Sequence, residues 1–178
     1  MLFRSTGFIS CYFDLRVLRE KDAMVRKLAK VVEQSGESVV ISNVAAEIEY
    51  VNETFVRRSG YTRAEVIGRN PRLLQSSLTP RATYDALWQA LKRGECWEGE
   101  FHNRCRDGSI IVEEAVIAPL SLSGSTSHYV GVCRDVTERV RRAAVLRLLE
   151  VLARAVNEVE TAEAAMSKCV ELICEYGH

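Results

Sequence analysis

The segment Cys96–Arg106 carries the residue pattern most indicative of a binding site. Its residues alternate as in a β-strand with one buried face, and Asn103 falls on the apolar side. That side comprises Trp97, Gly99, Phe101, Asn103 and Cys105, and the other comprises Glu98, Glu100, His102, Arg104 and Arg106. A buried amide without a hydrogen-bond partner costs roughly 1–3 kcal/mol. Asn103 is therefore expected to bond to a ligand, to a neighbouring backbone group or to a buried water.

Two adjacent glutamates, Glu113 and Glu114, are the next candidates for chemistry. Neighbouring strand residues point to opposite faces, so these carboxylates cannot flank one substrate together. Glu113 is expected to face inward and to pair with Arg72 or another cation, whereas a shift of one residue would place Glu114 inside instead. The sequence contains no Gly-rich phosphate loop, HExxH or GxSxG motif. We therefore predict no catalytic residues and no enzyme activity within these 178 residues.

The cysteines give no sign of a metal or disulfide site. They stand at positions 11, 96, 105, 133, 169 and 174 and form no CxxC pair. Zinc sites need ligands at closer, regular spacing. We interpret the cysteines as small hydrophobic core residues rather than as redox sensors. This usage predicts a protein of the reducing cytoplasm.

Charge and hydropathy exclude two further classes. The 178 residues include 24 Lys and Arg and 24 Asp and Glu, so the formal net charge is zero. Nucleic-acid-binding proteins carry a basic surplus, so we predict no nucleic-acid partner. No run of 18 or more apolar residues is present, which predicts no membrane span. The first residues, MLFRSTGFISCYF, do not resemble a signal peptide.

Apolar periodicity predicts an α+β domain with a helix at each end. Residues 14–34 form an amphipathic helix whose apolar stripe must pack on the domain or on a second copy of the chain. Five strand-like segments follow, at 38–43, 48–52, 96–106, 109–122 and 127–135. We expect them to pair as a five-stranded antiparallel sheet with the intervening helices over one face.

Capping residues and turns mark the boundaries between these elements. Asn52 and Thr62 each precede a short helix, and Thr79 is the expected N-cap of a longer helix with Pro80 at its first position. Asp107-Gly108 predicts a tight hairpin between the third and fourth strands. Residues 44–47 lack the usual Asp and Gly, so the geometry of the first hairpin is not predicted.

The chain then passes directly from a strand into a helix. Asp135-x-x-Glu138 resembles a capping box at this junction. A heptad pattern of apolar residues starts at Val145 and predicts a coiled coil. Thr161 could cap a new helix, so the pattern does not decide between one long helix and two.

Several segments, in this order, resemble the PAS family in its PAS-plus-PAC form. They are SVVISN, IEYVNETFVRRSGYTRAEVIGRNPRLLQ, CWEGEFHNRCRDGSI, VEEAVIAPL and HYVGVCRDVTE, and they cover residues 35–140. The resemblance implies an N-terminal helix at 1–34, a sensory PAS domain at 35–138, and a linker or coiled-coil helix at 139–178. This last stretch also resembles the opening helix of a GAF domain.

The resemblance also implies a set of cofactor-binding positions. In flavin-binding relatives the residue matching Asn103 holds the isoalloxazine ring, and Glu113 and Cys133 fall where light-sensing members of the LOV type have an asparagine and a glutamine. Their photoactive cysteine would follow Asn70, where this chain has Pro71, so flavin–cysteine photochemistry is not expected. Noncovalent FAD or FMN binding stays open. The remaining candidate contacts to a flavin are Asn70, Gln75 and Trp88. For Trp88 the alternative role is packing in the core.

Haem is not expected. Haem-binding PAS domains usually place a histidine on the long middle helix, and Pro80–Arg93 contains none.

The family transmits its signal through the strand-to-helix junction, which here is Asp135, Thr137 and Glu138. The resemblance therefore implies a sensor that relays through its C-terminal helix to an output domain, such as a histidine kinase or a diguanylate cyclase or phosphodiesterase, in the same chain. A homodimer through the N-terminal helix, the C-terminal helix or both is the expected assembly. The alternative is a dimerisation and relay module without a ligand of its own.

Overall fold

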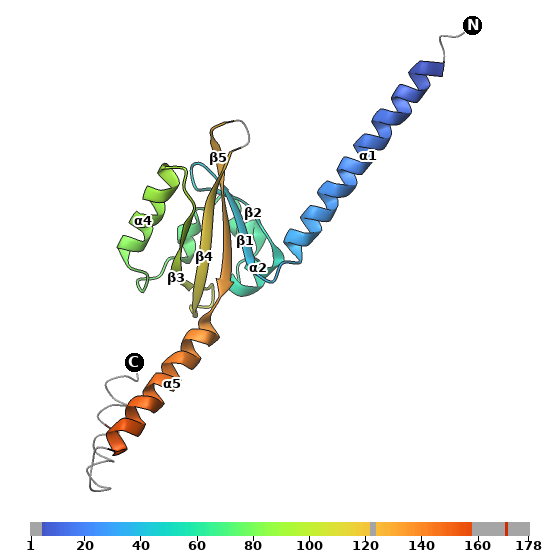
Figure 1. Ribbon diagram of the computed structural model, residues 1–178. Helices are drawn as coiled ribbons and strands as arrows, with labels where there is room; N and C mark the ends of the chain where they lie inside the picture. Colours follow the sequence, from blue (N-terminus) through green and yellow to red (C-terminus); the bar gives the residue numbers. More distant parts are fainter. Residues whose placement is uncertain (1–4, 122–123, 158–169, 171–178) are drawn as a thin grey trace.

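The computed structural model describes residues 5–121, 124–157 and 170 (Figure 1). A long helix precedes the domain and another follows it. The elements are α1 (Ser5–Glu33), β1 (Ser38–Asn43), β2 (Ile48–Val51), α2 (Glu53–Ser59), α3 (Arg63–Val66), the short 3-10 helix η1 (Pro71–Leu74), α4 (Arg81–Lys92), β3 (Trp97–Arg104), β4 (Ile110–Ser121), β5 (Thr126–Asp135) and α5 (Thr137–Asn157).

The strands form one five-stranded sheet in the order β2-β1-β5-β4-β3, with every neighbouring pair antiparallel. This confirms the predicted α+β fold. Residues opposite one another in antiparallel strands point to the same face. The pairs Trp97 with Ile117 and Val40 with Gly131 therefore continue one inner face across the sheet.

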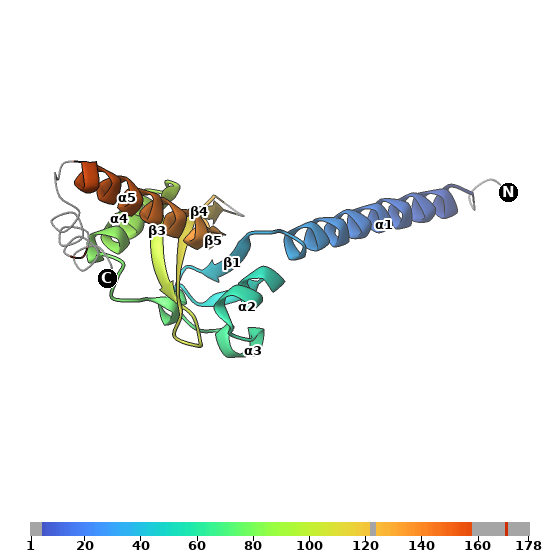
Figure 2. The ribbon, with the colours of Figure 1, turned by 90° about the horizontal axis from the view of Figure 1, so that it is seen from below.

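The helices cover this inner face in two groups. Leu87 and Leu91 of α4 pack on Trp97 and Phe101 of β3. The second group lies around β2, where buried side chains from four elements meet: Ile48, Val51, Phe55, Val66 and Leu74. Figures 1 and 2 show α4 beside β3 and α2 beside β1. The core thus fills the space between the sheet and α2, α3 and α4.

Local capping explains where the short helices begin and end. Asn52 accepts a hydrogen bond from the Phe55 N–H at 3.1 Å, as predicted, and α2 ends at Gly60 with φ 74°. Thr62 and Glu65 form a capping box on α3. The prediction for Thr79 was wrong. Its hydroxyl accepts from the His102 N–H at 2.8 Å, so Pro80 stands at the N-cap and α4 begins at Arg81.

The first hairpin turns without the usual Asp-Gly pair. The Asn43 side-chain oxygen accepts from the backbone N–H groups of Ala45 and Glu47, at 3.0 and 2.9 Å. An asparagine side chain that bonds two residues ahead imitates a backbone turn. Ala46 then adopts φ 59°, the left-handed conformation that glycine usually supplies.

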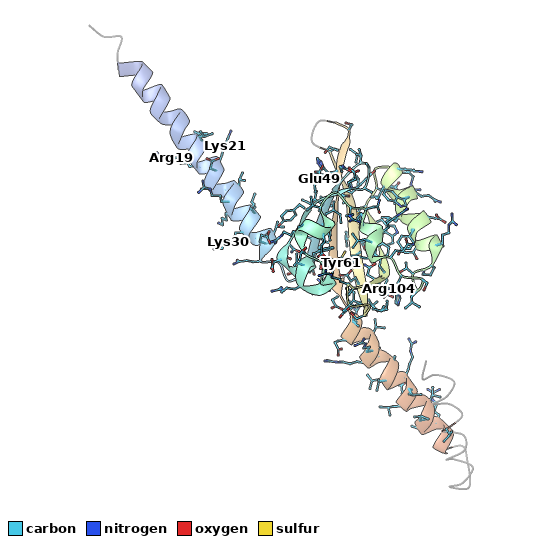
Figure 3. All side chains as sticks on the ribbon, turned by 180° about the vertical axis from the view of Figure 1, so that it is seen from behind. Arg19, Lys21, Lys30, Glu49, Tyr61 and Arg104 are labelled. Carbon is cyan, nitrogen blue, oxygen red and sulfur yellow. The ribbon has the colours of Figure 1, made fainter. Side chains whose placement is uncertain are left out.

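Helices α1 and α5 project away from the domain in Figure 1, and Figure 2 shows the same for α1. Apolar side chains on both are exposed: Leu18, Met24, Val25, Leu28 and Val31 on α1, and Val145, Leu146 and Leu149 on α5. Figure 3 shows Arg19, Lys21 and Lys30 along the same free length of α1. None of the helices within the described residues is both long and apolar enough to cross a membrane. Most of the predicted heptads and the GAF-like stretch lie outside the described residues.

Candidate functional site

A pair of polar side chains, Asn103 and Glu113, lies on the inner face of the sheet. The Asn103 Nδ2 donates to Glu113 Oε2 at 2.8 Å. Glu113 is only 4% exposed and stands opposite Phe101 in the β3–β4 pairing, which fixes its inward direction. Glu114 points outward and pairs with Arg139. Glu113, rather than Glu114, is therefore the inward carboxyl.

Glu113 is electrostatically unusual. Its burial raises the pKa above the ordinary carboxyl range, while the Asn103 hydrogen bond and the positive charge of Arg58 oppose this and the negative charge of Asp135 adds to it. The folded state therefore binds a proton at a pH where the unfolded chain has lost it. This proton stabilises the folded state fully at a pH below the ordinary carboxyl pKa. The stabilisation is lost as the pH rises through the raised pKa of Glu113.

Arg58, not Arg72, is the cation near Glu113. It lies in the last turn of α2 and donates through Nη1 to the Cys133 carbonyl at 3.3 Å and through Nη2 to the Gly36 carbonyl at 2.9 Å. These bonds join α2 to β5 and to the connection between α1 and β1. One guanidinium thus links three parts of the domain beside the buried carboxyl.

Cys133 shares the inner face with Glu113, since Cys133 is opposite Ala115 in the β4–β5 pairing. Burial raises the pKa of its thiol, and the Glu113 charge adds to that effect. A thiol held in the protonated form is a poor nucleophile and a poor metal ligand.

Three of the predicted cofactor residues have other contacts in the structure. The Asn70 side chain accepts from the Arg72 N–H at 3.0 Å and so caps η1. Gln75 is exposed and meets Asn103 only through a backbone bridge. Trp88 is 38% exposed and contacts the Tyr129 ring edge-on at 6.0 Å between centroids.

Aromatic side chains occupy the inner face between α4 and β3. The Phe101 ring lies 4.9 Å from the Trp97 ring and 5.5 Å from the Tyr84 ring, between centroids. The Tyr84 hydroxyl is buried and has no hydrogen-bond partner among the described residues. The Trp97 ring crosses over Gly99, where an added Cβ would lie 2.3 Å from it.

We predict that Gly99→Ala displaces the Trp97 ring and lowers the free energy of unfolding by about 1–3 kcal/mol, the usual cost of overpacking a core. Urea unfolding measures this loss, and the shift of Trp97 fluorescence in a Trp88→Phe background reports the ring's new surroundings. Gly36→Ala is a matched control, because an added Cβ at Gly36 meets no atom within 4 Å. Equal stability of the two variants would contradict the packing described here.

The junction to α5 lies at the end of β5. Asp135 Oδ1 accepts from the Thr137 N–H at 2.9 Å and from the Thr137 hydroxyl at 2.6 Å. The Thr137 Oγ1 in turn accepts from the Val112 N–H at 2.9 Å, which ties the helix start to β4. Glu138 instead faces solvent and pairs with Arg141 and Arg142. The cap is therefore Asp135 with Thr137, not the capping box with Glu138.

A surface cleft of about 260 Å³ lies between the end of α2 and the β3–β4 turn and shares Arg58 with this site. Its lining residues are Arg57, Arg58, Ser59, Gly60, Cys105, Arg106 and Asp107. Among residues 5–121, 124–157 and 170, no cluster of three His, Cys, Asp or Glu side chains could hold a metal ion.

Comparison with known families identifies this arrangement. The PAS domain family matches residues 36–138, more than half of the chain. The chain belongs to the PAS domain family. The nitrogen fixation regulatory protein of Klebsiella pneumoniae is 37% identical over 108 residues, which are 60% of this chain and 22% of that protein. The chain thus spans about a fifth of the length of this relative.

Two solved PAS-type structures are similar at 30% identity. An RNA-binding light-oxygen-voltage receptor superposes with a TM-score of 0.62 over 70% of this chain and 36% of that chain. A light-oxygen-voltage domain studied with a flavin analogue superposes with a TM-score of 0.59 over 70% of this chain and 96% of that chain.

The inner face of this PAS domain carries three kinds of polar side-chain group. Asn103 offers an amide, Glu113 a carboxyl and Tyr84 a buried hydroxyl that has no partner among the described residues. Sequence reasoning found the first two and missed Tyr84 and Arg58. The only available signal for Arg58 was the pair Arg57-Arg58 in a seven-residue helix, where adjacent residues point in different directions.

Proposed function

We propose that this PAS domain is a sensory module of a longer signalling protein and that it relays a change on its inner face to α5. The supporting observation is a row of polar groups that crosses the sheet. It runs from Asn103 on β3 through Glu113 on β4 to Asp135 on β5, and Asp135 holds Thr137 at the start of α5. A ligand that moves Asn103 or Glu113 would therefore change the support of the helix.

We propose a noncovalent flavin as the ligand class. The support is the similarity to light-oxygen-voltage domains, one of them studied with a flavin analogue. Asn103, Glu113 and the Tyr84 hydroxyl would hold the polar edge of the ring, and Cys133 would lie beside it. A bound flavin would supply redox chemistry. Pro71 follows Asn70 in this chain, so we propose no cysteine adduct.

A module without a ligand of its own is the second candidate. The observation that favours it is the packing of Trp97 over Gly99 and against Phe101, which fills part of the inner face with the chain's own side chains. Such a module would transmit through packing alone, and α1 and α5 would carry the interaction between copies.

The absorption spectrum of the purified protein, followed by mass spectrometry of released small molecules, separates the two candidates. We expect flavin absorption bands and a released FAD or FMN. A colourless protein that also fails to bind added FMN or FAD would contradict the flavin proposal and leave the ligand-free relay.

We further propose a homodimer through α1 and α5, because apolar side chains such as Leu28 (58% exposed) and Leu146 (61% exposed) have little burial within one copy. Light scattering of the same sample gives the mass, and a monomer at micromolar concentration would contradict this. In the cytoplasm of its host, the PAS domain itself would be non-catalytic. An output domain such as a kinase or cyclase would follow in the same chain, after the linker at 139–178.

A further inference from the structure

We propose that Glu113 is a protonation switch that couples the end of α1 to the start of α5. The inference deepens the relay proposed above and rests on it, but it requires no particular ligand. It rests on one buried carboxyl that interacts electrostatically with both groups that hold these helices, Arg58 and Asp135.

The first effect of Glu113 acts on the start of α5, through Asp135. Glu113 and Asp135 are direct partners in the β4–β5 pairing, and both residues lie on the same face. Directly opposed like charges on a sheet repel one another. Ionised Glu113 therefore disfavours the position in which the Asp135 carboxylate binds the Thr137 N–H and hydroxyl. Protonated Glu113 removes this repulsion and leaves the cap intact.

The second effect of Glu113 acts on the end of α1, through Arg58. Its Nη2 holds the carbonyl of Gly36, which lies three residues beyond the end of α1, and its Nη1 holds the carbonyl of Cys133. An ionised Glu113 attracts the Arg58 guanidinium, in competition with these two carbonyl oxygens. Protonation of Glu113 ends this competition, so Arg58 stays on the connection from α1.

The groups that face Glu113 come from three elements. Asn103 lies on β3 and Cys105 directly follows this strand, Arg58 lies on α2, and Cys133 and Asp135 lie on β5. Asn103 donates its hydrogen bond, so a protonated Glu113 can still accept it through its carbonyl oxygen. The change of charge therefore acts on Arg58 and Asp135 without breaking the Asn103 bond.

The direction of the switch follows from these contacts. When Glu113 is neutral and Asp135 is ionised, both junctions are tight. As pH rises through its raised pKa, the carboxylate pulls on Arg58 and repels Asp135, and both junctions loosen together. A charge that appears on a bound ligand near Glu113 would act in the same way, by moving the proton of this residue.

Amide hydrogen exchange tests the coupling in two backbone segments, residues 34–39 and 136–140. The wild type is compared with Glu113→Gln at each pH, so that the intrinsic pH dependence of exchange cancels. We expect wild-type exchange in both segments to accelerate together with rising pH by about three- to tenfold relative to Glu113→Gln, the range given by half to one pKa unit of coupling. Residues 81–92 of α4 should show no such difference.

Two variants make the test specific. Glu98→Gln removes an exposed carboxylate from the outer face of β3 and should keep the wild-type pH dependence in both segments. Arg58→Gln should abolish the response at 34–39 and keep the response at 136–140. The inference fails if wild type and Glu113→Gln exchange alike at all pH values, or if the two segments respond at different pH. If exchange at 136–140 responds to Asp135→Ala but not to pH, this switch is absent while the relay proposal stands.

Discussion

Replacing Asn52 with alanine is expected to lower the free energy of unfolding by about 3–5 kcal/mol, the upper end for a single substitution. Asn52 is fully buried, and its amide bonds to four backbone groups. The side-chain oxygen accepts from the N–H groups of Val39 and Phe55, and the nitrogen donates to the carbonyls of Val32 and Glu37. Alanine leaves these groups unpaired and removes the N-cap of α2.

Urea unfolding followed by far-ultraviolet circular dichroism measures this loss. Asn43→Ala is a matched control, since Asn43 also bonds to two backbone N–H groups but in a surface turn, and we expect it to cost about 1 kcal/mol. Asn52→Asp should fall between the two, because it keeps the acceptor for Val39 and Phe55 and loses the donor. Equal costs for Asn52→Ala and Asn43→Ala would show that the buried network does not fix the end of α1.

Asn52 also illustrates what sequence can predict. Its role as the N-cap of α2 follows from local spacing, and so do the Asp107-Gly108 turn and the alternation in β3. Three of its four bonds reach residues 13 to 20 positions away, and no local pattern encodes them. Thr79 shows the converse. The position of Thr79 before a predicted helix matched an N-cap. In the structure its hydroxyl instead accepts a hydrogen bond from the backbone N–H of His102, 23 residues away.

The candidate site divides in the same way. Strand alternation places Asn103 and Glu113 on the inner face, because a period of two depends only on neighbouring residues. Their bond to each other depends on the register between β3 and β4, which the sequence leaves undetermined by one residue. Arg58 and Tyr84 lie on helices, and which of their neighbours face the sheet depends on how each helix packs. The roles of these two residues become visible only in the folded domain.

The second substitution with a large expected effect lies at the start of α5. Asp135→Ala removes both hydrogen bonds to Thr137 and should cost the helix start about 1–2 kcal/mol, as the loss of a helix cap does. Hydrogen exchange at the Val140 N–H, which bonds the Val136 carbonyl at 2.9 Å, should accelerate about tenfold or more. In the full-length protein, the output activity should lose its response to the signal, because the inner face no longer determines the position of α5.

Glu138→Ala separates a relay from simple helix stability. Glu138 is one residue beyond Thr137, and it pairs with Arg141 and Arg142. All three side chains are exposed to solvent, where an ion pair contributes about 0–1 kcal/mol to stability. Glu138 also makes no bond to the sheet among the described residues, so its loss should leave exchange at Val140 and the output response almost unchanged. If Asp135→Ala and Glu138→Ala have the same effect on the output, stability of α5 alone determines signalling. If neither variant alters the output, the signal leaves the domain by a route other than this junction, for which the exposed apolar side of α1 is the other candidate.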